Sequence, residues 1–154
     1  MGWGTRPALT PAQQYLHLQR NPSCAGDGVL RPTGLTWRYN TRPSVLSREY
    51  SVRIEYNRDD TPRAFIDSPN LAELAEGRDL PHVYRDPVRL CLFLPSAKEW
   101  HASMRIDETF VPWVAIWLYY FEDWLASGEW RGGGAHPNED DNERPPRRLR
   151  RGMR

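Results

Sequence analysis

Hydrophobic and polar positions alternate in three short stretches of the first half of the chain. Residues 35–40 and 50–57 each place an apolar side chain at every second position. This spacing is typical of a strand with one buried face. Residues 64–66 form a third, shorter stretch, which follows a predicted turn at 57–62. Because consecutive strands with short connections pair with each other, the pattern predicts an antiparallel β-meander of three strands.

A helix is predicted before the meander, from a capping box at its start. Thr10 can cap the helix, Pro11 suits the first helical position, and Gln13 can reach back to the backbone of Thr10. We expect the helix to end near Arg20, before the Asn-Pro pair that begins at Asn21.

A longer helix is predicted near the end of the domain, where apolar residues recur every three or four positions. These residues are Phe110, Trp113, Val114, Trp117, Leu118, Phe121, Trp124 and Leu125. Pro112 is tolerated only in the first turn, so the helix begins no earlier than about Thr109. Gly128 is a natural end.

The remaining segments lack a clear period. We expect residues 21–33 to form a loop and residues 70–88 to be irregular, followed by a short apolar run at 89–94. Helix, meander, irregular segment and helix together predict an α+β fold.

The chain divides into a domain at 1–134 and a charged tail at 135–154. Residues 132–134 are three glycines, which suggest a hinge, and the tail contains an acidic block followed by a basic one. Segments with so few apolar residues cannot build a core, so we expect the tail to be disordered. The basic block at 144–154 suggests contact with nucleic acid, but the adjacent acidic block makes such a partner unlikely.

Overall charge and hydropathy indicate no special environment. The net charge is +1 and the mean hydropathy is −0.75, as in a soluble protein. The longest uncharged apolar run is too short to span a membrane, and the start lacks the apolar core of a signal peptide, so a cytoplasmic location is expected. Single, scattered histidines give no metal site, and no cofactor is expected.

Two cysteines are candidates for thiol chemistry. Cys24 lies in the predicted loop at 21–33, where an exposed free thiol is expected. Cys91 lies beside the irregular segment, where a side chain can reach solvent and act as a nucleophile. The alternative is that Cys91 is a small buried apolar residue between Leu90 and Leu92. Lys98 is the only lysine, which fits a GC-rich genome or an enzyme that transfers acyl groups to lysine.

The order of motifs resembles that of ubiquitin-conjugating enzymes. His82 and Tyr84 belong to a tripeptide that begins nine residues before Cys91, and Trp100 follows Cys91 by nine residues. The family has a His-Pro-Asn tripeptide, a catalytic cysteine and a tryptophan at similar spacings. The resemblance implies a UBC-like fold over roughly residues 9–127, with Cys91 as the catalytic cysteine.

The chain resembles most closely the stand-alone conjugating proteins of bacterial antiphage operons, the short type II CBASS systems. The motifs that carry this resemblance are Leu80-Pro81-His82-Val83-Tyr84, Leu90-Cys91-Leu92-Phe93, Glu99-Trp100, Val111-Pro112-Trp113, Trp117-Leu118 and Gly128-Glu129-Trp130. The resemblance implies a partner, a cGAS-like nucleotidyltransferase (CD-NTase) whose C-terminus is joined to another molecule through an unknown amine acceptor. It also implies that no dedicated activating enzyme is encoded alongside.

Tyr84 and His82 are candidate supporting residues for Cys91, and the sequence allows two interpretations of each. Tyr84 stands where the family has an asparagine, so its phenol is either a donor to the oxyanion or a loop aromatic packed on the sheet. His82 either moves protons or is structural, as the family's histidine mainly is. The function expected is transfer of a protein C-terminus through a Cys91 thioester to an amine. The alternative is a UBC-like binding module without catalysis.

Overall fold

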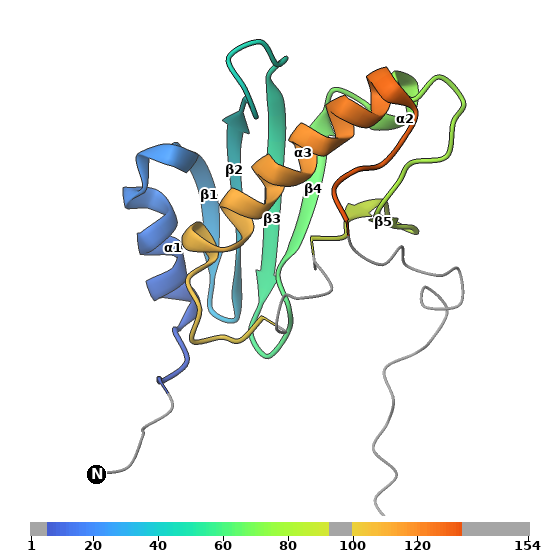
Figure 1. The fold of residues 1–154 in the computed structure, drawn as a ribbon. Coiled ribbons are helices and arrows are strands. Elements are labelled where there is room, and N and C mark those ends of the chain that lie inside the picture. The colour runs from blue at the N-terminus through green and yellow to red at the C-terminus, as the bar shows by residue number, and fades with distance from the viewer. Residues whose placement is uncertain (1–5, 93–99, 134–154) are drawn as a thin grey trace, which may run out of the picture.

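The computed structural model describes residues 6–92 and 100–133. A four-stranded antiparallel sheet, ordered β1-β2-β3-β4, forms its centre, and a two-stranded ribbon, β5-β6, lies beside it (Figure 1). The elements in chain order are α1 (Pro11–Arg20), η1 (Pro22–Cys24), β1 (Gly26–Arg31), β2 (Gly34–Thr41), β3 (Tyr50–Asn57), β4 (Arg63–Ser68), α2 (Leu71–Leu74), β5 (Val83–Tyr84), β6 (Arg89–Leu90), η2 (Ile106–Glu108) and α3 (Phe110–Ser127).

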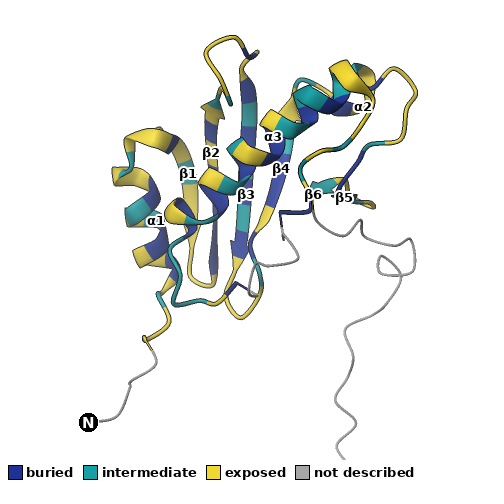
Figure 2. Ribbon diagram, viewed as in Figure 1, coloured by how far each residue is buried: buried dark blue, intermediate teal, exposed yellow. Residues whose placement is uncertain are grey.

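Helix α3 crosses one face of the sheet, and α1 flanks the β1 edge (Figure 1). The alternating residues of β2 and β3 supply the sheet's side of the core, among them Trp37 and Ile54, and α3 supplies Val114, Leu118 and Phe121. Figure 2 shows buried positions alternating with intermediate ones along β3. The α+β fold class is therefore confirmed, and the arrangement is consistent with a UBC-like fold.

Both main helices begin and end where the sequence predicts. The Thr10 hydroxyl accepts from the backbone of Gln13 at 3.2 Å, and the Gln13 side chain accepts from the Thr10 backbone at 2.9 Å. In α3, Pro112 lies in the first turn, and Gly128 ends the helix with a φ of 75°. A left-handed residue at this position is what glycine permits without steric cost.

The prediction of a loop at 21–33 is wrong, because this segment contains η1 and the additional strand β1. Five of the six residues of β1 are exposed, so the strand has no apolar alternation that could have revealed it. Its backbone packs closely against β2, so a side chain is not tolerated at Gly26. A Cβ there would lie 1.9 Å from the Arg38 carbonyl oxygen. The meander therefore has four strands.

The segment at 70–88 is only partly irregular. It contains α2, whose start is capped by Asn70, and the short strand β5. Residues 134–154, which include the predicted tail, lie outside the described residues. Within the described ranges, no helix combines the length and the apolar character needed to cross a membrane.

Candidate functional site

The ribbon β5-β6 carries the residues predicted for the site. Val83 pairs with Leu90, and Tyr84 pairs with Arg89. Val83 and Leu90 are buried in the main core, which attaches the ribbon to the rest of the domain. Cys91 follows β6 directly, and its backbone N–H donates to the carbonyl oxygen of His82 at 3.1 Å. The structure thus brings Cys91 and His82 together across the ribbon.

His82 connects the ribbon to helix α3. Its carbonyl oxygen accepts a second hydrogen bond, from the indole N–H of Trp117 at 2.9 Å. The backbone of His82 has a φ of 46°, a conformation that non-glycine residues rarely adopt. The imidazole is buried and stacks on Trp130, with 4.9 Å between ring centroids. These contacts hold His82 between the ribbon and α3, which fits the structural interpretation of the two expected.

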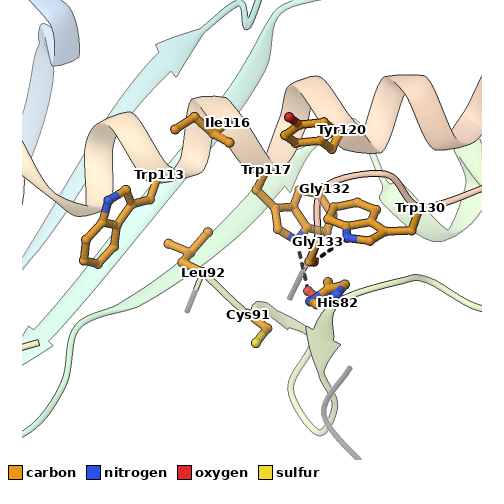
Figure 3. Close-up of a pocket in the computed structure, with 10 residues that line it drawn as sticks. All are labelled: His82, Cys91, Leu92, Trp113, Ile116, Trp117, Tyr120, Trp130, Gly132 and Gly133. Carbon is orange, nitrogen blue, oxygen red and sulfur yellow. Dashed lines mark hydrogen bonds between the residues drawn. The ribbon is translucent and has the colours of Figure 1, made fainter. Parts of the chain in front are cut away.

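An apolar cavity of about 30 Å³ lies between Cys91 and α3. Its lining is almost entirely aromatic, aliphatic or glycine, and Figure 3 shows His82, Cys91, Leu92, Trp113, Ile116, Trp117, Tyr120, Trp130, Gly132 and Gly133. In this view Leu92 points toward α3, whereas the sulfur of Cys91 points away from it (Figure 3). The thiol therefore lies at the margin of the cavity.

The chain beyond α3 folds back and forms one wall of this cavity. The Trp130 indole N–H donates to the Gly133 carbonyl at 3.1 Å. A Cβ on Gly132 would come within 2.9 Å of the Trp130 ring and 3.0 Å of the Tyr120 ring. Of the three glycines expected to form a hinge, Gly132 is thus packed against aromatic rings and Gly133 accepts the indole hydrogen bond. The third, Gly134, lies outside the described residues.

Cys91 is buried, so the expectation that it reaches solvent is wrong. Its side chain is 7% exposed, since Leu90 and Leu92 draw this stretch of chain into the core. The stretch that follows, residues 93–99, lies outside the described residues.

Cys24 is not the exposed thiol that the sequence suggests. It is fully buried in the core, with its carbonyl accepting from the Trp37 indole at 3.0 Å and its thiol donating to the Leu18 carbonyl at 3.5 Å. Burial, together with the charge of Asp107, raises the pKa of the Cys24 thiol to about 11. The thiolate, which is the reactive form, is therefore strongly disfavoured at Cys24.

Tyr84 does not line the cavity at Cys91. It is half-buried and lines a second cavity, where the guanidinium of Arg89 lies 4.7 Å from its ring centroid. Trp100 is a core residue, packed edge-on against Tyr56 with 5.4 Å between ring centroids.

The sequence gives no site contact for three residues, although Trp117 and Trp130 belong to motifs that carry the family resemblance. The helical spacing of Trp117 predicts a core position and gives no sign of its hydrogen bond to the His82 carbonyl. Trp130 and Arg89 lie outside any periodic element, although Arg89 stands only two residues before Cys91. Their roles arise from contacts that no local pattern encodes.

The comparisons with known proteins agree with this arrangement. A protein family described as Type II CBASS E2 protein matches residues 14–137, a range that includes the sheet, the ribbon, both cysteines and α3. No curated protein matches the chain. Because the family match covers well over half of the 154 residues, the chain belongs to the family of type II CBASS E2 proteins.

Proposed function

We propose that this protein is a ubiquitin-conjugating-like transferase that forms a thioester between Cys91 and the C-terminus of a partner protein. The partner proposed is a cGAS-like nucleotidyltransferase, and the acyl group then passes to an amine during antiphage defence. The observation that carries the proposal is the backbone bond from Cys91 to His82, which holds a thiol at the margin of a cavity in a chain of the E2 family. A cytoplasmic location, where thiols stay reduced, suits the two unpaired cysteines.

The reaction proposed has two steps. In loading, the Cys91 thiolate attacks the carbonyl carbon of an activated C-terminus, such as a preformed thioester. The new C–S bond forms, the bond to the earlier leaving group breaks, and the proton of the thiol passes to that group. In transfer, an amine nitrogen attacks the same carbon, the C–S bond breaks, and the departing thiolate takes up the proton that the amine loses.

His82 and Tyr84 are proposed as supporting residues. His82 acts as a positioning residue, since its carbonyl holds both the Cys91 backbone and Trp117. We assign to the Tyr84 phenol the donation of a hydrogen bond to the oxyanion that forms when the amine attacks. Its support is that Tyr84 pairs with Arg89, two residues from Cys91.

The proposal is tested by co-expression with the partner, followed by denaturing gels with and without reductant and mass spectrometry of the linked peptide. We expect a reductant-sensitive adduct in the wild type and none in Cys91→Ala. Cys91→Ser and Cys91→Lys should instead trap a stable ester or amide, because oxygen and nitrogen leave less readily than sulfur. Cys24→Ala is the matched control and should retain the adduct, because Cys24 is fully buried.

The alternative function is a binding module without catalysis, which the 7% exposure of Cys91 favours. Such a module would bind its partner without a covalent link. A native complex that never becomes covalent in the wild type and forms equally well with Cys91→Ala would establish this alternative. An adduct that survives denaturation unchanged in Cys91→Ala would contradict the Cys91 thioester.

A further inference from the structure

A second cavity lies on the other side of Leu92 from the aromatic one. Its volume is about 260 Å³, and Leu92 lines both cavities. The turn between β3 and β4, the ribbon β5-β6 and the start of α3 surround it, contributing among others Asp60, Arg63, Tyr84 and Arg89. Unlike the aromatic cavity, this one has a wall that is partly polar.

Two guanidinium groups face this cavity without a carboxylate partner. Arg89 stacks over Tyr84, and among the described residues neither Arg89 nor Arg63 forms an ion pair. Burial lowers the pKa of Arg89, and the positive charge of Arg63 lowers it further. Two like charges held beside one cavity favour the binding of an anion between them.

The acidic residue that lines the cavity, Asp60, favours the charged form of Arg89 through its own charge but forms no ion pair with it. Asp60 turns one carboxylate oxygen back to the N–H of Thr61, at 2.9 Å. Within the described part of the chain, no ion pair joins Asp60 to either arginine, so both guanidinium groups keep their forked donors for a ligand. Such forks match the geometry of a carboxylate.

One residue that lines this cavity, Arg89, is close to the proposed nucleophile Cys91 along the chain. Arg89 precedes Cys91 by two residues, which span at most about 7 Å of extended chain. A polypeptide whose C-terminus is joined to the Cys91 sulfur therefore has its last few side chains within reach of Arg89. An acidic side chain there would meet both arginines.

We propose that Arg63 and Arg89 form a carboxylate-binding site that recognises an acidic side chain among the last few residues of the acyl donor. The identity of the occupant rests on the proposed function, whereas the carboxylate site itself does not. The site adds a charge criterion to donor selection, separate from any apolar contact in the aromatic cavity.

The site is tested by NMR titration of the full-length Cys91→Ala protein with N-acetylglutamate α-amide, N-acetylglutamine α-amide and inorganic phosphate. We expect saturable shifts at Arg63, Tyr84 and Arg89 with the glutamate compound and none with the glutamine compound, which carries no carboxylate. Arg89→Gln and Arg63→Gln should each weaken binding about tenfold or more, as expected for loss of a charged hydrogen bond. Arg58→Gln removes an exposed charge from the same turn and should leave binding unchanged.

Each outcome decides the proposal. Equal binding of the glutamine compound, or unchanged binding in a well-folded Arg89→Gln variant, would overturn the site. Tighter binding of phosphate than of N-acetylglutamate α-amide would overturn its assignment to an acidic side chain. Because Cys91→Ala cannot form a thioester, this test and the adduct test of the proposed function fail independently.

Discussion

The backbone N–H of Cys91 donates to the carbonyl oxygen of His82 across 3.1 Å, and that same oxygen accepts from the indole of Trp117 at 2.9 Å. One carbonyl thus joins the segment of the candidate nucleophile to the middle of α3. The backbone of His82 adopts a left-handed φ of 46° at this point, a conformation that persists only where surrounding contacts enforce it. The position of Cys91 consequently depends on how tightly α3 and the ribbon pack.

We predict that iodoacetamide modifies Cys91 faster than Cys24 in the native protein. Cys24 is 0% exposed, and its pKa of about 11 leaves about one thiolate per thousand thiols at pH 8. Peptide mapping after timed alkylation gives the two rates, and the difference should vanish in denaturant. Faster labelling of Cys24 in folded protein would count heavily against Cys91 as the nucleophile.

Tyr84→Phe is expected to slow transfer to the amine by about 10²–10³-fold while leaving loading of Cys91 nearly unchanged. The reason is that a phenol assigned to the oxyanion acts when the amine attacks. Single-turnover assays that follow adduct formation and adduct decay separately measure both steps. If loading and transfer fall equally, the contribution of Tyr84 is its packing under Arg89, with 4.7 Å between guanidinium and ring centroid.

Gly132→Ala is expected to loosen the wall of the aromatic cavity. The new Cβ would lie 2.9 Å from the Trp130 ring, so that ring, which stacks on His82, must shift. Overpacking of this kind costs about 1–3 kcal/mol of unfolding free energy. Urea unfolding should show that loss, and alkylation of Cys91 should become faster. Glu129→Ala, an exposed change in the same segment, should alter neither quantity.

Acid should weaken the fold through Asp107. Burial by itself raises the pKa of this carboxyl, but hydrogen bonds from Arg105 at 2.7 Å and Asn21 at 2.9 Å outweigh it and hold the pKa below 3.8. A group whose pKa is lowered by folding stabilises the protein above its ordinary pKa and loses that contribution as the pH falls through the folded value.

Asp107→Asn should therefore lower the unfolding free energy at pH 7 by about 1–3 kcal/mol, and the deficit should shrink below about pH 4. Urea unfolding at several pH values measures it. Glu108→Gln is the control, since Glu108 also pairs with Arg105 but has a side chain that is 61% exposed. An Asp107→Asn deficit that stays constant down to acid pH would contradict the role assigned to the carboxylate.

Gln14→Ala is expected to destabilise the domain by about 2–4 kcal/mol, because it removes the side-chain partner of one buried and one partly buried backbone group. The buried Gln14 side chain donates to the Met104 carbonyl at 2.7 Å and accepts from the Ile106 N–H at 2.9 Å. These bonds tie α1 to the segment that leads into α3. Thermal or urea unfolding tests the change, with the exposed Gln19→Ala as the control that should differ little from wild type.

The amino-acid sequence determined the features that depend on neighbouring residues. Thr10 and Gln13 form the capping box, and Gly128 ends α3, because caps are made within one helical turn. The strands with one buried face, β2 and β3, were predicted because period-two alternation reports burial on one side. The spacing of His82 and Cys91 carried the resemblance to the family, whereas the ribbon β5-β6 between them was not predicted.

Tertiary structure alone decided the features that depend on distant residues. Strand β1 is exposed on both faces, so only its pairing with β2 defines it. Cys24 is buried against Trp37 and Leu18, and the sequence around Cys24 does not predict either contact. The aromatic cavity forms because Trp130 returns to stack on His82, 48 positions earlier in the numbering, and packing between such remote segments has no local pattern in the sequence.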